Sequence, residues 1–218
     1  MNTSMSLETV TVADAATQRL RESLFAGGFA AGEEIKDTQI AAAYGIARPT
    51  ARVAVQQLIN EGILVRPPGF SARVRTFDAA QVRDLYRVRR LIELDAVREI
   101  VRSHSPIAGV ASALEGFADL QGGDDDWSQI AAADVAFHTA VVDAAGSPRL
   151  QQFFSGITSE IRLLIALLRD QYTGGDALYQ EHETLYRLLD GATPHMEVEA
   201  AWSDHLESAE RFLVQHLS

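Results

Sequence analysis

The stretch that decides the fold is residues 44–75, YGIARPTARVAVQQLINEGILVRPPGFSARVR. It holds five arginines and a single acid, Glu61, although the whole chain carries a formal net charge of -11. A basic island in an acidic protein indicates a polyanionic partner. With a short helix expected just before it, the stretch predicts two helices joined by a tight glycine turn and followed by a two-stranded hairpin. That order is typical of a winged helix-turn-helix, which binds DNA.

The surrounding residues set the limits of these elements. We expect helices over residues 13–25, from Asp37 or Thr38 to 43, and from Arg48 or Pro49 to 60, and strands over 63–66 and 72–76. Gly45 makes the turn, because glycine accepts backbone conformations that other residues resist. Asp37 or Thr38 can cap the second helix through a side-chain oxygen. The apolar side of the third helix is predicted to consist of Val53, Val55, Leu58 and Ile59.

The composition is that of a globular protein whose two parts differ in charge. Of the 218 residues, 47% are hydrophobic and none is cysteine, which excludes disulfides and cysteine-based metal sites. No apolar run approaches the roughly 18–20 residues of a membrane helix and no secretory signal is evident, so we expect a cytoplasmic protein. Residues 1–76 hold eight basic and seven acidic side chains, a net of +1, so the remainder must carry -12. We therefore predict two domains, residues 1–77 and 78–218.

The second part is predicted to be entirely helical. Helical periodicity covers residues 79–103, 107–120, 127–145, 148–170, 176–190 and 195–217. The breaks fall at glycines and prolines such as Pro106 and Pro148, and no strand pattern follows Asp78. The predicted fold class is therefore mainly α. It combines an N-terminal winged helix-turn-helix that has a small β-hairpin wing with a C-terminal, all-α antiparallel bundle of six to seven helices.

Four ionisable side chains interrupt the apolar helix faces of this bundle. Asp134 and His138 lie one turn apart on one face, and His182 and His205 each lie in an apolar stripe of their own helix. Ionisable groups that point inward are costly unless they are paired or bind a metal. If the last two helices form a hairpin near residue 192, His182 and His205 lie within about 4 Å of the same level along its axis. One carboxylate and three imidazoles suit zinc, with nickel or manganese as alternatives. The remaining histidines, His104, His195 and His216, are interpreted as surface groups.

The arginines of residues 44–75 occupy the positions of DNA contacts. The second helix of a helix-turn-helix enters the major groove, where Arg48 and Arg52 can reach guanine or a phosphate. Gly69 at the wing tip allows the backbone to approach DNA closely. The DNA contacts that we expect are Thr38, Arg48, Thr50, Arg52, Arg66, Gly69 and Arg73. A helical domain whose arginines only solvate one face is the alternative that the pattern leaves open.

Residues 15–76 resemble the N-terminal domain of the GntR family of transcription regulators. The resemblance rests on Phe25-Ala-Gly-Gly, Gly45-Ile-Ala-Arg48, Arg52 and Glu61-Gly-Ile-Leu-Val. It implies that Arg48 and Arg52 are the arginine pair of the recognition helix and that Gly69 is the wing glycine. Thr38 stands where some members have a DNA-contacting arginine, and Val53 stands where glutamate is common. The resemblance therefore implies an operator sequence particular to this chain.

Residues 80–217 resemble the FCD effector domain that accompanies the GntR domain in the FadR subfamily. The metal pattern of that domain falls on Asp134, His138, His182 and His205. An arginine and a glutamate near the start of the domain match Arg89 and Glu93. The resemblance implies a metal-containing pocket in which Arg89, Glu93 and Asp134 bind a small carboxylate effector.

Together these features predict a transcription regulator, not an enzyme: a repressor that binds double-stranded operator DNA as a homodimer. Effector binding would favour a dimer geometry whose recognition helices no longer match half-sites about one DNA turn apart. Two alternatives remain at this point. One is a regulator that senses the metal itself, with no organic effector. The other is a metal-dependent hydrolase, because three histidines and an aspartate leave a metal position open for water.

Overall fold

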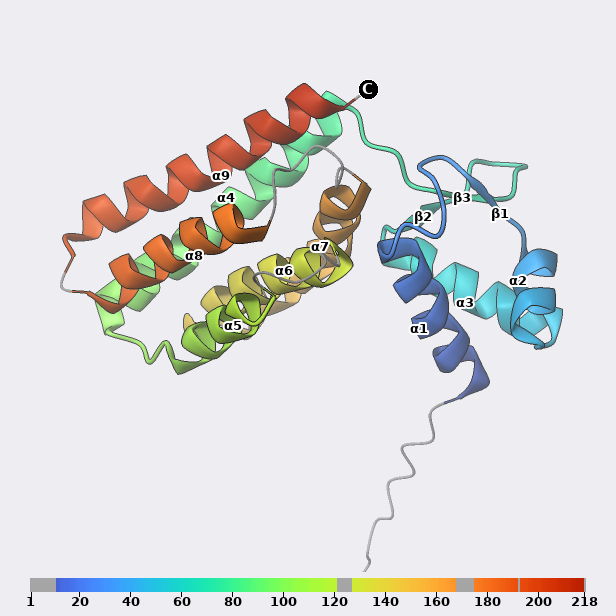
Figure 1. Cartoon of the computed structure of the whole chain (residues 1–218), viewed down its shortest axis with the longest axis horizontal. Helices are drawn as coiled ribbons and strands as arrows, with labels where there is room; N and C mark the ends of the chain where they lie inside the picture. Colours follow the sequence, from blue (N-terminus) through green and yellow to red (C-terminus); the bar gives the residue numbers. More distant parts are fainter. Residues whose placement is uncertain (1–10, 121–126, 168–174, 192, 218) are drawn as a thin grey trace, which may run out of the picture. The chain divides into compact units, whose positions relative to one another are not determined.

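The computed structural model describes residues 11–120, 127–167, 175–191 and 193–217. Contacts between residues divide the chain into two compact units (Figure 1). The first unit holds the residues up to Leu24 together with Gly28–Arg75, and the second holds Phe25–Gly27 and Thr76–Ser218. Helices and a small sheet form the first unit, whereas the described part of the second contains helices only.

The first unit contains the helices and the tight turn that the sequence predicts. Its helices are α1 (Val12–Phe25), α2 (Asp37–Tyr44) and α3 (Arg48–Asn60). Gly45 ends α2 in the left-handed conformation, with a φ of 65°, and its N–H donates to the carbonyl of Ala41. Pro49 lies in the first turn of α3, where a missing N–H has no cost. The turn is thus formed by residue types that suit its backbone.

Two expectations about side chains in this unit are wrong. Val53 is 47% exposed and does not belong to the apolar side of α3. That side consists of Ala51, Ala54, Val55 and Leu58. These four positions follow the i, i+3, i+4, i+7 spacing of one helix face, which position 53 does not share. Neither Asp37 nor Thr38 caps α2, because the N-cap is Lys36 and no side-chain cap hydrogen bond is present there.

The wing is a three-stranded sheet, where the sequence predicted two strands. Its strands are β1 (Glu34–Ile35), β2 (Leu64–Val65) and β3 (Ala72–Val74), in the order β1-β3-β2. Both outer strands run antiparallel to β3, and Glu34 and Val65 lie opposite Arg73 on its two sides. Both hairpin strands are shorter than expected. Residues 67–68, which follow β2, are prolines and have no N–H to donate. Gly69, with a φ of 81°, lies in the wing tip between β2 and β3.

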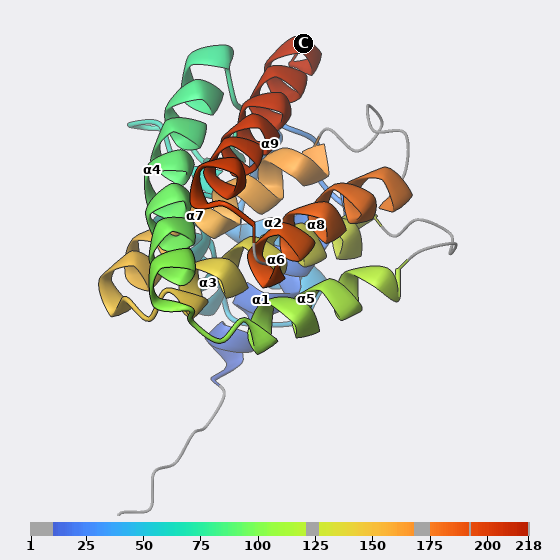
Figure 2. The ribbon, with the colours of Figure 1, turned by 90° about the vertical axis from the view of Figure 1, so that its left-hand side faces the viewer.

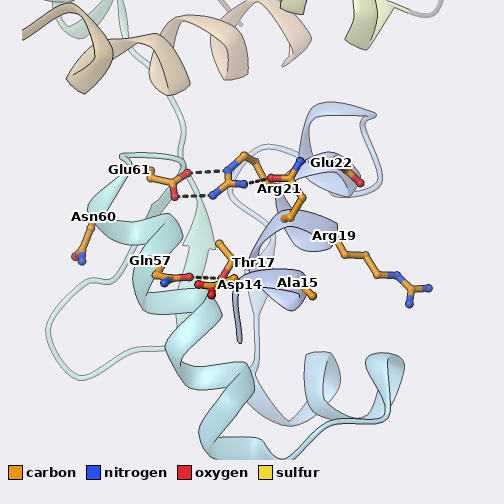
Figure 3. Close-up of a pocket in the computed structure, with 10 residues that line it drawn as sticks. Asp14, Ala15, Thr17, Arg19, Arg21, Glu22, Gln57, Asn60 and Glu61 are labelled. Atoms are coloured by element: carbon orange, nitrogen blue, oxygen red, sulfur yellow. Dashed lines mark hydrogen bonds and ion pairs between the residues drawn. The ribbon is translucent and has the colours of Figure 1, made fainter. Parts of the chain in front are cut away.

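An ion pair joins α1 to the end of α3 (Figure 3). Arg21 donates from Nη2 and Nε to the two carboxylate oxygens of Glu61, at 2.7 and 2.8 Å. Thr17 and Gln57 form a hydrogen bond between the same two helices, beside an open hollow of about 950 Å³. The side chains of Arg21 and Glu61 are 23% and 30% exposed, so solvent screens their attraction and we assign it roughly 0.2–1 kcal/mol. These contacts fix the orientation of α3 on α1.

Six helices form the described part of the second unit. They are α4 (Ala79–Ser103), α5 (Ala108–Ala118), α6 (Trp127–Ala144), α7 (Pro148–Leu167), α8 (Gly175–Asp190) and α9 (His195–His216). The bounds agree closely with those expected, except that residues 168–170 of the fourth predicted helix lie outside the described residues. None of the described helices is long and apolar enough to cross a membrane.

The long helix α4 begins and ends at clear local signals. Asp78 accepts from the N–H of Gln81, and the Gln81 side chain accepts from the N–H of Asp78, which is a capping box. His104 ends the helix with a φ of 50°. Within the bundle α4 contacts α6, α7, α8 and α9. These local signals fix both ends of α4. They therefore also fix where along the bundle its inward side chains contact the other helices.

Ion pairs show how α9 lies against α4. Arg90 Nη1 is 2.5 Å from Glu210 Oε2, and Arg98 Nε is 2.6 Å from Glu199 Oε2. The residue numbers rise on one helix as they fall on the other, so the two helices run antiparallel. Figures 1 and 2 both show α9 beside α4. The inward side of α9 then reaches the middle of the bundle, where Trp202 is fully buried.

Candidate nucleic-acid interface and metal centre

The N-terminal end of α3 presents two arginines one turn apart. Arg48 is exposed, and the side chain of Arg52 is 61% exposed. A hollow of about 380 Å³ lies between this end of α3, the start of α2 and the wing. Four of the predicted DNA contacts line it, namely Thr38, Arg48, Arg66 and Gly69. The other three, Thr50, Arg52 and Arg73, lie outside its lining.

An acid that was not predicted as part of this surface lies among its arginines. Asp37 Oδ2 is 3.2 Å from Arg52 Nε, and Asp37 Oδ1 is 4.0 Å from Arg66 Nη2. Arg66 also donates from Nη1 to Gln56 Oε1 at 3.1 Å. Two of the predicted DNA contacts, Arg52 and Arg66, therefore pair with Asp37, and a third, Arg73, donates to the carbonyl of Gly32 at 3.1 Å.

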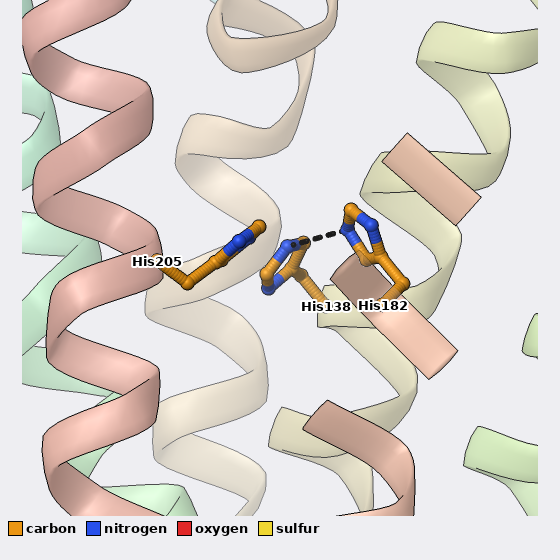
Figure 4. Close-up of side chains that lie close together, drawn as sticks. All are labelled: His138, His182 and His205. Atoms are coloured by element: carbon orange, nitrogen blue, oxygen red, sulfur yellow. Dashed lines mark hydrogen bonds between the residues drawn. The ribbon is translucent and has the colours of Figure 1, made fainter. Parts of the chain in front are cut away.

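Three imidazoles converge in the bundle, one each from α6, α8 and α9 (Figure 4). One ring nitrogen from each of His138, His182 and His205 lies within 4.8 Å of the others. The Nε2 atoms of His138 and His182 are 3.2 Å apart. Asp134, one turn before His138, places Oδ1 at 3.2 Å from His182 Nε2 and 4.0 Å from His138 Nε2. The four residues predicted to bind a metal therefore lie together.

Each of the three rings also turns its Nδ1 toward an acceptor. The pairs are His138 with Glu93 Oε2 at 2.6 Å, His182 with the Leu178 carbonyl at 2.6 Å, and His205 with Glu181 Oε2 at 3.4 Å. A carbonyl or a carboxylate only accepts, so Nδ1 carries the hydrogen and Nε2 presents a lone pair. Two lone pairs 3.2 Å apart repel unless a cation lies between them. Acceptors on the outer nitrogen are also what orients metal-binding histidines, so this donor set fits a divalent ion.

Glu93 links the histidine cluster to Arg89. One of its oxygens accepts from Arg89 Nε at 2.6 Å, and the other contacts His138 and accepts from Trp202 Nε1 at 2.9 Å. Arg89 Nη2 lies 3.9 Å from Asp134 Oδ2, a buried atom with no hydrogen-bond partner in the described residues. Because position 89 faces 134 and position 93 faces 138, α4 and α6 run parallel. The sequence places Arg89 inward, but it does not reveal this shared network.

Burial and charge set the protonation of the cluster. Burial lowers the pKa of His138 to about 4, and the charge of Arg89 acts in the same direction. Burial opposes the charged form of Glu93, but His138 and Arg89 outweigh it and lower the pKa of Glu93 to about 2. Burial is likewise outweighed at Asp134, where His182, His138 and Arg89 lower the pKa of the carboxyl. At pH 7 the cluster thus offers a neutral His138 imidazole beside two carboxylates, which is the form that binds metal.

A cavity of about 230 Å³ lies beside the imidazoles. Its polar lining consists of Tyr86, Arg89, Asp134, Glu181, His205 and Ser208, and its apolar lining of Ile165, Ala177, Leu178, Ala209 and Phe212. Burial raises the pKa of Tyr86 to about 12, so its hydroxyl keeps its proton and can donate. The volume is below the roughly 300–1,000 Å³ of pockets for drug-sized ligands, which favours a small metabolite.

Two family models match the chain. The model for bacterial regulatory proteins of the gntR family matches residues 12–74, and the FCD domain model matches residues 84–208, which is more than half of the chain. The chain belongs to the GntR family of regulators with an FCD domain. This GntR–FCD protein is accordingly a DNA-binding transcriptional regulator and not an enzyme.

Relatives of the GntR–FCD protein have modest sequence identity over most of their length. It is 24% identical over 174 residues to the uncharacterized HTH-type transcriptional regulator YdhC of Bacillus subtilis (strain 168), covering 77% of this chain and 76% of that one. It is 24% identical over 205 residues to the probable D-xylose utilization operon transcriptional repressor of Paenarthrobacter nicotinovorans, covering 94% and 89%. A solved structure of a GntR transcriptional regulator from Rhodococcus sp. RHA1 matches with a TM-score of 0.82 at 23% identity, covering 93% and 97%. At that identity the likeness shows a shared fold.

The remaining residues of the FCD domain that were singled out from the sequence differ in how deeply they are buried. Glu93 is fully buried behind His138 and does not line the cavity. His104 and His195 are exposed, as expected of surface groups. His216 is half-buried, with Nδ1 at 2.7 Å from the carbonyl oxygen of Phe212.

Proposed function

We propose that this GntR–FCD regulator is a repressor that binds operator DNA as a homodimer and responds to a small carboxylate held beside a divalent metal. The observation that carries the proposal is the cluster of three imidazoles next to a cavity that contains Arg89, in a chain that also has a winged helix-turn-helix. Similarity to a protein described as a transcriptional repressor supports the repressor assignment. Action on chromosomal DNA accords with the cytoplasmic location expected from the sequence.

The proposed metal ligands are Asp134, His138, His182 and His205. Imidazole nitrogen and carboxylate oxygen suit zinc, with nickel and manganese as alternatives. When bound, the ion would supply open coordination positions for the oxygen atoms of a ligand. The pairing of every Nδ1 with an acceptor supports this assignment, because it turns the Nε2 lone pairs inward.

Arg89 is the proposed anchor of the effector carboxylate. Its guanidinium offers a planar fork of donors that matches a carboxylate, and it lines the cavity. Asp134 lines the cavity as well, so it can contact both the metal and the effector. Glu93 contacts Arg89 from outside the cavity. We therefore assign effector contact to Arg89 and Asp134, and the orientation of Arg89 and His138 to Glu93.

The homodimer is proposed to form through adjoining faces of α4 and α7. Leu91 on α4 and Phe153 on α7 are each 67% exposed, and Val88 on α4 is 36% exposed. The two helices contact each other, and Phe153 lines one hollow together with Asp95 and Glu99 of α4. Exposed apolar groups of this kind are what subunit interfaces cover. A twofold dimer would present two recognition helices to a palindromic operator.

The DNA-binding part is tested by letting the full-length protein select duplexes from a random pool. We expect a palindromic sequence to be enriched, since a twofold dimer reads two half-sites. The double substitution Arg48→Ala with Arg52→Ala should weaken binding to that sequence at least about tenfold, because one bidentate arginine contact alone contributes roughly 1–3 kcal/mol. Arg102→Ala, which removes an exposed arginine from α4, is the control. The proposal fails if no sequence is enriched, or if the double variant binds the enriched sequence as wild type does.

A metal sensor with no organic effector is the second candidate. It is favoured by the burial of His138 and His182, whose facing nitrogens call for a cation whether or not a ligand is present. Such a protein would change its affinity for the selected duplex when metal is removed, and no acid added to the metal-loaded protein would change it further.

A further inference from the structure

Asp37 lies at the centre of the proposed DNA-reading surface. It is the first residue of α2, and it lines the hollow that Thr38, Arg48, Arg66 and Gly69 also line. Its side chain is 17% exposed, whereas that of its partner Arg52 is 61% exposed. The carboxylate is therefore largely covered, while the arginine that it holds extends into solvent.

The atoms through which Asp37 and Arg52 meet leave the rest of the guanidinium available. The contact joins Asp37 Oδ2 to Arg52 Nε at 3.2 Å. Arginine has five N–H donors in a fixed plane, so the two terminal nitrogens keep theirs. Guanine presents O6 and N7 side by side in the major groove and accepts two such donors at once. An arginine held at Nε is thus already oriented for a two-point contact with guanine.

The same carboxylate disfavours contact with the DNA backbone. It repels phosphate oxygens that enter the hollow, and it neutralises Arg52, which would otherwise release one counter-ion on binding any sequence. Arg48 differs, because no acid lies within ion-pair distance of it in the part of the chain that the structure describes. General attraction to DNA can therefore come from Arg48, while Arg52 is reserved for a base.

We propose that Asp37 is a specificity-determining residue of this regulator. It orients Arg52 toward a guanine and lowers the affinity for DNA of unrelated sequence. The inference rests on the proposed DNA reading by α3, and it extends that reading to a residue whose charge is opposite to that of the arginines.

The test is Asp37→Asn in the full-length protein, assayed by fluorescence anisotropy on two duplexes at several salt concentrations. One duplex carries the sequence selected by wild type, and the other is a shuffled version of it. We expect affinity for the shuffled duplex to rise about fivefold to tenfold and its salt slope to steepen by about 0.9, the value of one added phosphate contact. The ratio of specific to non-specific affinity should fall about tenfold, the scale of one bidentate base contact.

Three controls separate this role from a general effect of charge or folding. Glu22→Gln removes one negative charge from α1, outside the hollow, and should leave the affinity ratio unchanged. Asp37→Ser also removes the charge and should have the same effect on the ratio. Thermal melting of Asp37→Asn, Asp37→Ser and wild type shows whether either substitution destabilises the protein. In an Arg52→Gln background, Asp37→Asn should change the ratio much less, because the arginine that Asp37 orients toward a base is absent. The inference is overturned if Asp37→Asn keeps the wild-type ratio and salt slope, or if Glu22→Gln reproduces its effect. If wild type selects no sequence, the proposed DNA-reading function itself fails.

Discussion

Each of the three clustered imidazoles uses Nδ1 for an acceptor and leaves Nε2 to face the cluster. His182→Ala and, separately, His205→Ala should therefore each lose the metal, because too few ligands remain to hold it. Wild type should retain about one ion for each chain after dialysis, measured by elemental mass spectrometry. His195→Ala, which removes an exposed histidine, should keep the metal. Full metal content in the first two variants would contradict the assignment of the ligands.

Glu93 allows a second prediction at the residue scale. Its carboxylate contacts His138 at 2.6 Å, and a neighbouring carboxylate raises the basicity of a metal-binding imidazole. Glu93→Gln keeps the shape of the side chain but removes the charge, and it should weaken metal binding by about 10–100-fold. Competition with a coloured chelator measures that change. Glu99→Gln, at an exposed ion pair on the same helix, should bind metal as wild type does. Equal metal affinities in the two variants would show that Glu93 does not support the metal-binding histidines.

The sequence was sufficient to predict which four side chains lie together in the bundle, but not how their neighbours support them. Polar groups at helical spacing on apolar faces identify Asp134 and the three histidines. The partner of Arg52 could not be identified in this way, because Asp37 lies fifteen positions earlier in the chain on a different helix. An acid near the start of a helix is ordinary, and only the tertiary fold brings it beside an arginine of α3.

Among the helices, α4 carries both Arg89 and Glu93, so its start matters to the site. Asp78→Ala removes the side-chain acceptor of the capping box and should destabilise the protein by about 1 kcal/mol. The melting temperature should fall by about 2–4 °C, as measured by circular dichroism. Asp84→Ala, at an exposed position of the same helix, is the matched control. A melting temperature as low for the control as for Asp78→Ala would show that the cap has no special effect.

Elements with strong local signals could be predicted, and elements that depend on distant partners could not. Glycine, proline and capping residues mark the ends of the helices, and helical periodicity marks their length. Strand β1 is only two residues long, which is too short for an alternating pattern. It forms because it pairs with β3, which lies almost forty positions further along the chain. The parallel pairing of α4 with α6 is of the same kind, since it depends on the order in which the whole bundle packs.

For the whole molecule, the exposed apolar groups on α4 and α7 predict the state of assembly. Leu91→Asp together with Phe153→Asp should convert a dimer into a monomer, because a buried interface does not accept unpaired charges. Sedimentation velocity measures the change. Val12→Asp replaces an exposed apolar side chain of α1 and should leave the dimer intact. A wild-type monomer, or a variant that stays dimeric, would contradict the proposed interface.

An effector-responsive repressor requires that its FCD cavity control DNA binding, and two sites are coupled only if each ligand distinguishes the same two states. The direct test is the affinity of the metal-loaded protein for its selected duplex, measured with and without a panel of small mono- and dicarboxylic acids. We expect one class of carboxylic acid to weaken DNA binding by about 5–150-fold. Ala209→Leu, which fills the cavity but removes none of the proposed ligands, should keep metal and DNA binding and lose that response. Affinity that no acid changes, or a response that survives Ala209→Leu, would contradict the account.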